Sequence, residues 1–301
     1  MSAYRDGGLF LLLSMLWGTA FVAIRAGLEY IPPVLFAGFR YDLAAILMLA
    51  YAASKTTYWR PHTRGDWLTV GVGAVLIIAV YNAFLFVGQQ DVTSAVAAIL
   101  VATSPILTTA FSRALLPDQR LTAVGILGLI LGLVGVGLVV NPDPANLLAS
   151  DLLAPGLVFT AAVAVALGSV LVQRIESDIS TEGMTAWSFA LGAVLLHLLS
   201  AVHPGESLSS TEVTGGAVVA VVYLSVFASA IGYFIYFRLL ERLGAIEINL
   251  VSYAAPIFAA LFGWLLLAET LTPLAIVGFF VIFTGFVLLK RRAIANEFGL
   301  V

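Results

Sequence analysis

Cysteine is absent from this chain, and charged residues are scarce. Without a thiol, the protein has no disulfide, no thiolate metal site and no catalytic cysteine. Only 10% of its 301 residues are charged, whereas soluble domains carry about 25%. Apolar runs of about 20 residues recur from one end to the other, and each is long enough to cross a bilayer. With 61% hydrophobic residues, the sequence predicts a multi-pass protein of the cell (plasma) membrane.

Short polar breaks divide the sequence into ten apolar spans and leave no room for a soluble domain of useful size. The spans lie at residues 9–28, 34–54, 67–87, 93–112, 121–140, 152–173, 184–202, 214–239, 244–267 and 273–290. Because backbone facing lipid must satisfy its own hydrogen bonds, each span is predicted to be a helix and the fold class is all-α. Residues 1–28 lack a clear small-residue cleavage site, so we expect a retained helix rather than a signal peptide.

The placement of Lys and Arg predicts the orientation in the membrane. If the N-terminus is inside, 12 of the 14 basic residues fall in inside segments, and only Arg25 and Arg40 fall near outside ends. Cytoplasmic loops carry an excess of Lys and Arg, so this orientation is favoured over its reverse. Both the N and C termini are therefore predicted to be cytoplasmic.

The last third of the chain repeats an earlier stretch about 150 residues upstream. Residues 244–285 align with residues 93–135, so that Pro256 meets Pro105 and Glu269 meets Asp118. The copies divide the chain into two five-span units, residues 1–147 and 148–301. Because five is odd, the second unit enters the membrane from the opposite side, giving two inverted five-helix repeats. Such repeats place a substrate site near the midplane, where the halves meet.

Four segments resemble the EamA-type family of the drug/metabolite transporter superfamily. They are LWGTAFVAIR at residues 16–25, Phe39-Arg40, residues 93–122, and residues 236–273 with their AETLTP sequence. The resemblance implies ten helices and a central cavity lined by the first, third, fourth, sixth, eighth and ninth spans. It implies that the fifth and tenth spans pack together away from the cavity. It also implies export or exchange of amino acids and similar small metabolites.

The ninth span carries three candidate residues on one helical face. Asn249, Tyr253 and Pro256 are spaced four and three apart, and their repeat partners include Ala98 and Ala102. We predict that Asn249 and Tyr253 bind the substrate while the alanines leave room for it. The alternative is that Asn249 bonds a neighbouring helix and Tyr253 only packs.

The two aligned prolines are predicted to act as hinges. Pro105 and Pro256 each lack a backbone donor and leave a carbonyl unpaired, which permits movement of a gating helix. A static kink is the alternative. Ser104 is expected to satisfy one of the two free carbonyls, and it also joins the predicted substrate-binding residues.

Polar aromatic side chains in the first, third and eighth spans complete the predicted substrate site. The candidates are Trp17, Tyr81, Asn82, Ser229 and Tyr233. Rings with polar tips suit the wall of a pocket for amino acids or aromatic metabolites. The alternatives are packing for Trp17 and a place at the lipid headgroups for the tyrosines.

Charged residues within the spans are few, and most are interpreted as compensated. Arg40 and Asp42 are expected to form a pair near the outer interface, and His197 is expected to be packed or interfacial. Glu247 either carries a coupling proton, pairs with Arg242 or reaches water. No deep chain of carboxylates follows from the sequence, so proton coupling has no support there.

Two stripes of small residues predict a tight helix contact. Gly125, Gly128, Gly132 and Gly135 share one face of the fifth span, and Ala275, Gly278 and Gly285 share one face of the tenth. Small residues let helix backbones approach closely. We therefore expect the fifth and tenth spans to pack together, with a dimer surface as a further possibility.

Together these features predict a transporter that works by alternating access around a midplane cavity, as an exporter or exchanger. A channel-like facilitator is the first alternative, and an intramembrane enzyme is a more distant one, because no nucleophile–base or metal pattern occurs. The expected partners are a small-molecule substrate and membrane lipid, with no nucleic acid. No cofactor and no metal are expected, and the protein is predicted to be a monomer or homodimer.

Overall fold

A computed structural model describes residues 2–115, 123–141, 152–243 and 248–297, and these ranges contain helices and no strand. The helices are α1 (Ser2–Gly27), α2 (Pro33–Lys55), α3 (Arg64–Val72), α4 (Tyr81–Gly88), α5 (Ser94–Val101), α6 (Ser104–Leu115), α7 (Ala123–Val140), α8 (Leu153–Arg174), α9 (Thr181–Val202), α10 (Gly215–Val222), α11 (Gly232–Leu243), α13 (Val251–Leu267) and α14 (Pro273–Glu297). The π-helices η1 (Gly73–Val80) and η4 (Tyr223–Ile231) join α3 to α4 and α10 to α11, and η3 (Leu208–Ser210) is a 3₁₀ turn.

Each predicted span corresponds to an apolar helix or to a run of connected helices in the described residues. Seven are long and apolar enough to cross a membrane, from Arg5–Gly27 to Gly215–Leu243. The helices of the fifth, ninth and tenth spans are shorter, at Val124–Val140, Val251–Leu267 and Pro273–Leu289. The all-α class is confirmed. A count of ten crossings stays a prediction, and the boundary between residues 147 and 148 lies outside the described residues.

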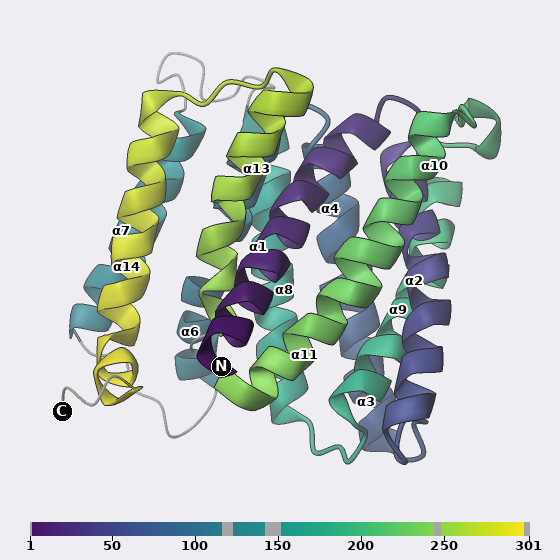
Figure 1. Cartoon of the computed structure of the whole chain (residues 1–301), viewed down its shortest axis with the longest axis horizontal. Helices are drawn as coiled ribbons and strands as arrows, with labels where there is room; N and C mark the ends of the chain where they lie inside the picture. Colours follow the sequence, from purple (N-terminus) through teal and green to yellow (C-terminus); the bar gives the residue numbers. More distant parts are fainter. Residues whose placement is uncertain (1, 116–122, 142–151, 244–247, 298–301) are drawn as a thin grey trace.

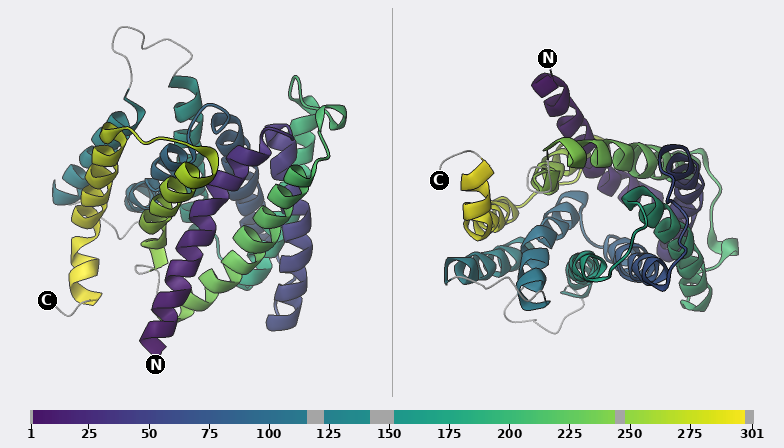
Figure 2. Two further views of the ribbon diagram at one scale, coloured as in Figure 1. Left: turned by 45° about the horizontal axis from the view of Figure 1, so that its top comes forward. Right: turned by 90° about the horizontal axis from the view of Figure 1, so that it is seen from below.

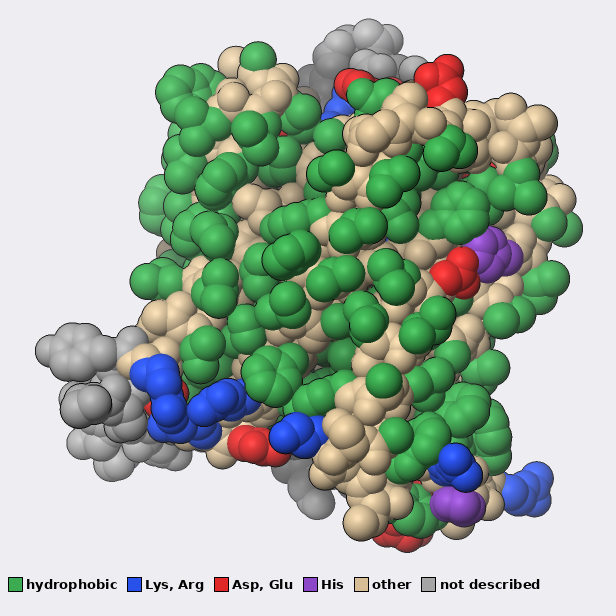
Figure 3. Space-filling model, turned by 45° about the vertical axis from the view of Figure 1, so that its right-hand side comes forward, with side chains coloured by type: hydrophobic (Ala, Val, Ile, Leu, Met, Phe, Trp, Pro, Cys, Tyr) green, Lys and Arg blue, Asp and Glu red, His purple; other side chains and the backbone are tan. Residues whose placement is uncertain are grey.

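The helices stand roughly side by side and form one bundle (Figures 1 and 2). The start of α1 and the end of α14 lie at the same end of this bundle, which we call the basal end; the other is the distal end. Figure 3 shows a face covered by apolar side chains, with basic side chains gathered along its lower edge. This is the pattern expected of a bundle in a bilayer with its basal end in the cytoplasm, an orientation that stays a prediction.

Hydroxyl side chains fix where several helices begin. The Thr93 hydroxyl accepts the Val96 N–H at the start of α5, and the Ser180 hydroxyl accepts the Gly183 N–H at the start of α9. At the start of α3, Thr63 and Asp66 form a capping box. Such caps satisfy backbone donors that the first helical turn leaves free. They account for sharp helix starts in a sequence that is otherwise almost uniformly apolar.

The predicted contact between the fifth and tenth spans is present as a seam between α7 and α14 (Figure 1). A Cβ placed on Gly128 would lie 2.6 Å from the Gly285 carbonyl oxygen, and one on Gly278 would lie 2.7 Å from that of Gly135. Only glycine allows backbones this close. The seam lies at one side of the bundle, away from the centre (Figures 1 and 2).

The two halves share an irregularity as well as a sequence pattern. The π-helices η1 and η4 begin at Gly73 and Tyr223, which are 150 residues apart, the same offset that relates the sequence copies. π-helical segments are uncommon and often occur at functional sites. Both segments lead directly into helices whose first residues, Tyr81 and Gly232–Tyr233, approach the centre of the bundle.

Candidate functional site

A cavity of about 230 Å³ lies among helices of both halves. Its lining residues are Trp17, Ala20, Phe21, Ile24, Arg40, Tyr41, Ile77, Tyr81, Leu85, Ala98, Val101, Ala102, Ser104, Val165, Tyr233, Ser252 and Ala255. The wall is thus mainly apolar and aromatic, with a few polar groups, which is the usual make-up of a small-molecule site. Pockets for drug-sized ligands run from about 300 to 1,000 Å³, so this cavity suits a smaller compound.

Trp17 joins the two halves at the cavity wall. Its ring lies 5.8 Å from the Tyr233 ring and 5.6 Å from the Tyr236 ring. Its indole N–H donates to the Ala228 carbonyl of η4 at 3.1 Å. A buried indole needs such a partner. The contact fixes Trp17 against η4 and leaves the rest of the ring to line the cavity.

Four of the predicted substrate-binding residues line the cavity, namely Trp17, Tyr81, Ser104 and Tyr233. Asn82 and Ser229 are fully buried behind its wall. The Asn82 amide contacts the Tyr41 hydroxyl at 3.2 Å and the Ile78 carbonyl at 2.7 Å, so it positions a tyrosine of the wall. Whether any of these residues binds a substrate stays a prediction.

The ninth span turns a different face to the cavity from the predicted one. Ser252 and Ala255 line the cavity, whereas the Tyr253 ring packs on Phe283 and Phe286 of α14, with centroids 5.4 and 4.7 Å away. Asn249, on the same face as Tyr253, does not line it either. Ser252 and Ala255 each precede a residue of the predicted face by one position, which is about 100° around a helix. Substrate binding by Asn249 and Tyr253 stays a prediction. The first copy does provide Ala98 and Ala102 to the cavity, as expected.

The two aligned prolines occupy different local environments. Helix α5 ends before a turn at Ala102 and Thr103, so Pro105 lies in the first turn of α6, where proline is tolerated. Pro256 lies inside α13, where it removes a helical hydrogen bond. The Ser104 hydroxyl donates to the Val101 carbonyl at 2.6 Å, which confirms that Ser104 satisfies a carbonyl freed by proline. Neither proline lines the cavity, and a hinge role stays a prediction.

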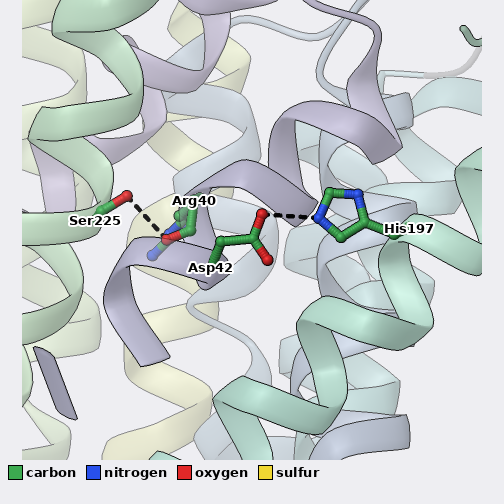
Figure 4. Close-up of polar contacts among 4 residues, drawn as sticks. All are labelled: Arg40, Asp42, His197 and Ser225. Carbon is green, nitrogen blue, oxygen red and sulfur yellow. Dashed lines mark hydrogen bonds and ion pairs between the residues drawn. The ribbon is translucent and has the colours of Figure 1, made fainter. Parts of the chain in front are cut away.

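The expected pairing of Arg40 with Asp42 is wrong. Asp42 bonds His197 of α9 instead, with 2.8 Å between its Oδ2 and the ring Nε2, and both side chains are partly exposed. Figure 4 shows Asp42 turned toward His197, while Arg40 lies on the side of α2 near Ser225. Residues two apart on a helix do not share a face. His197 thus bonds Asp42 and also packs on the Phe39 ring, with centroids 5.7 Å apart.

Arg40 is the residue of the cavity that the sequence interpretation missed. Its side chain is only 8% exposed, and it lines the cavity from α2, a span that was not expected to contribute. A charged Arg at the centre of a membrane helix costs at least about 2.5–3.5 kcal/mol on insertion scales. The signal available in the sequence was an Arg inside an apolar span, at a spacing that excludes pairing with Asp42.

A network at the basal end ties the loops of the two halves together. The fully buried Asp66 accepts hydrogen bonds from the Tyr58 hydroxyl at 2.9 Å and the Ser177 hydroxyl at 2.8 Å. The bond to Asp66 raises the pKa of the Tyr58 phenol above its usual value. At the same end of the bundle, Arg242 at the end of α11 pairs with Asp6 of α1 at 2.9 Å. The alternative partner for Arg242, Glu247, lies outside the described residues.

The distal end has its own contact between halves. The Glu269 carboxylate, in the turn between α13 and α14, accepts the Ser94 N–H at 3.0 and 3.1 Å and the Ser94 hydroxyl at 3.1 Å. A carboxylate at a helix N-terminus is stabilised by the free N–H groups and the helix dipole. An acidic residue of one repeat thus caps α5 of the other. Its sequence counterpart, Asp118, lies outside the described residues.

The comparison with known proteins decides the family. The profile of the EamA-like transporter family matches residues 7–141 and again residues 152–291. This chain belongs to the EamA-like transporter family. Among the described residues, no group of three or more His, Asp or Glu side chains is placed to hold a metal ion. As a member of this family, the protein is a multi-pass membrane transporter.

Relatives of this EamA-like transporter cover nearly the whole chain. It is 28% identical over 279 residues to the uncharacterized transporter YoaV of Bacillus subtilis, which is 91% of this chain and 92% of YoaV. It is 31% identical over 277 residues to the uncharacterized inner membrane transporter YedA of Escherichia coli, 89% of this chain and 84% of YedA. A solved crystal structure, 21% identical, shares the fold with a TM-score of 0.65 over 96% of this chain and 99% of that one.

Proposed function

We propose that this protein carries small polar metabolites, amino acids or related compounds, across the plasma membrane by alternating access around the cavity. The observation that carries the proposal is that both halves build the cavity. The first contributes Trp17, Tyr81 and Ala98, and the second contributes Tyr233 and Ser252. A cavity built between two repeats opens to alternate sides when the repeats move against each other.

Two contacts between the halves support such movement, because each lies at one end of the bundle. Asp66 and Ser177 meet at the basal end, and Glu269 and Ser94 meet at the distal end. Each of these two contacts is made of a few hydrogen bonds. Hydrogen bonds of charged groups contribute about 1.5–3 kcal/mol each, an amount that substrate binding can offset during a transport cycle.

Counterflow in proteoliposomes tests the proposal. Vesicles containing the purified protein are preloaded with an unlabelled amino acid mixture, and uptake of each labelled amino acid is followed. A carrier can return to the outer side with unlabelled substrate bound. Preloading should therefore accelerate uptake of the labelled compound severalfold over that of empty vesicles, and uptake should saturate. Uptake that neither saturates nor responds to preloading would instead favour the channel-like facilitator.

A pair of variants two residues apart on α13 ties the transport to the cavity. Ala255 lines the cavity and is 5% exposed, whereas Ile257 is 60% exposed on the outer surface of the bundle. Ala255→Phe should fill the cavity and reduce counterflow at least about tenfold, while Ile257→Phe should keep it. Thermal unfolding must first show that both variants are folded. Equal counterflow by the two variants would move the transport path elsewhere.

A further inference from the structure

Arg40 is held in the cavity wall by two serines of the other half. Its Nε donates to the Ser229 hydroxyl at 3.1 Å, and its backbone carbonyl accepts the Ser225 hydroxyl at 2.8 Å (Figure 4). Both serines are fully buried on η4. The guanidinium carbon also lies 5.0 Å from the centre of the Tyr41 ring. The Ser229 and Tyr41 contacts fix the direction of the side chain, the Ser225 contact holds the backbone, and all three are to neutral groups.

No described acidic group neutralises this buried charge. The ion pairs among the described residues are Asp42–His197 and Arg242–Asp6, and neither includes Arg40. The lining of the cavity contains no Asp or Glu. A guanidinium has five N–H donors, and the Ser229 contact uses one of them. A buried charge is expensive unless it is paired, so a positive charge in the wall of a cavity without an acidic side chain favours a negatively charged ligand.

We propose that Arg40 binds the carboxylate of the transported compound, which makes the substrates small organic acids, amino acids included. The inference rests on the proposed transport function and narrows its substrate class. A planar guanidinium fork matches a carboxylate in two parallel hydrogen bonds. The rings of Trp17, Phe21 and Tyr233 then contact the body of the ligand. One cation in a mainly apolar wall suits a group with a single negative charge, and so favours a carboxylate group over a phosphate dianion.

Matched acid and amide probes test the assignment. Thermal unfolding midpoints of the purified protein are measured while titrating L-phenylalanine, L-leucine, 3-phenylpropanoate and lactate, each against its carboxamide. Binding stabilises the folded state according to occupancy. We expect at least one acid to bind about tenfold or more tightly than its amide, the scale of a charged hydrogen-bonded pair. If no acid is preferred over its amide, or if only inorganic phosphate stabilises the protein, the assignment is wrong.

Variants separate a ligand-binding role from a purely structural one. In Arg40→Gln the ratio of acid to amide affinity should fall to about one. In Arg40→Lys it should fall severalfold and stay above one, because Lys keeps the charge and loses the fork. Arg25→Gln is the matched control, since Arg25 bonds the Gln89 carbonyl at 3.2 Å and lies outside the cavity lining; it should keep the wild-type ratio.

The Lys variant also protects the test against misfolding. If Arg40→Gln gives no folded protein, an unchanged ratio in Arg40→Lys overturns the assignment, and a reduced ratio supports it. Failure of the transport proposal is recognised separately. A preference for acids without counterflow would refute the carrier and keep the role of Arg40. Counterflow of amides as fast as acids would refute the role of Arg40 and keep the carrier.

Discussion

Tyr253 places a phenol hydroxyl in the packing between α13 and α14. The residue is 4% exposed, and its hydroxyl has no hydrogen-bond partner among the described residues. An unsatisfied buried polar group costs about 1–3 kcal/mol. The ring itself packs on Phe283 and Phe286. At this position the ring therefore stabilises the protein and the hydroxyl does not.

Two substitutions of Tyr253 should accordingly have opposite effects. Tyr253→Phe should leave the free energy of unfolding unchanged or raise it by about 1 kcal/mol, with counterflow intact. Tyr253→Ala should lower it by about 3–5 kcal/mol, as for other buried aromatic truncations. Thermal unfolding and counterflow measure both effects. Loss of transport in a fully stable Tyr253→Phe protein would instead restore the predicted substrate contact of this hydroxyl.

Some residues of the cavity could be predicted from the sequence and others could not. Trp17, Tyr81, Ser104 and Tyr233 were predicted because polar aromatic and hydroxyl groups inside apolar spans tend to face the bundle interior. The place of Arg40 in the cavity was not predicted, because Arg40 was paired with Asp42 from their closeness in the sequence. Residues two apart lie on different faces of a helix. The packing of Tyr253 on α14 was not predicted, because spacing shows which residues share a face but not which neighbour that face meets.

The α7–α14 seam makes a prediction at the scale of helices. A Cβ on Gly135 would lie 2.8 Å from the Gly278 carbonyl oxygen and 2.9 Å from the Ile282 nitrogen, whereas one on Gly137 would meet nothing within 4 Å. Gly135→Ala should therefore destabilise the protein by about 1–3 kcal/mol through overpacking. Gly137→Ala, on the same helix, should be neutral or stabilise it by up to about 1 kcal/mol. Thermal unfolding compares the pair, and equal midpoints would contradict the seam.

Elements followed from the sequence to different degrees. Helix positions were predictable because the runs of apolar residues are long and the polar breaks are sharp. The glycine stripes predicted which two helices pack together. The turn at Ala102 and Thr103, by contrast, divides the predicted fourth span into two helices, α5 and α6. The π-helices η1 (GAVLIIAV) and η4 (YLSVFASAI) lie in mainly apolar segments that look like ordinary α-helix in the sequence. The hydropathy of a segment does not show whether its backbone hydrogen bonds follow the α-helical or the π-helical register.

At the scale of the molecule, sidedness is open to a direct test. Lys55 is the last residue of α2, which ends at the basal end, and Ser209 lies in η3, just before α10 begins at the distal end. Both residues are exposed. Because the chain has no cysteine, each of Lys55→Cys and Ser209→Cys introduces a single thiol. A membrane-impermeant maleimide should label Ser209→Cys in intact cells and Lys55→Cys only after permeabilisation. The reverse pattern would overturn the predicted cytoplasmic termini, and labelling of both from outside would overturn a spanning bundle.

The all-helical membrane architecture was predictable in outline because long apolar runs recur along the entire chain. The site was less so, because it depends on which helix faces meet. Helix α2 illustrates the difference. It presents Arg40 to the cavity and Asp42 to His197 on the partly exposed side. The hydropathy of α2 predicts a membrane helix, but it does not show that Arg40 and Asp42 lie on opposite faces of it.

The π-helical segments have a consequence for how such a protein diversifies. Tyr81 and Tyr233 follow η1 and η4 within two residues, and both line the cavity. Removing one residue upstream of either tyrosine turns it by about 100° around its helix and takes the ring out of the wall. A deletion of one codon therefore changes which face of the following helix lines the cavity. Insertions and deletions inside these segments are a route to new selectivity that point substitutions do not offer.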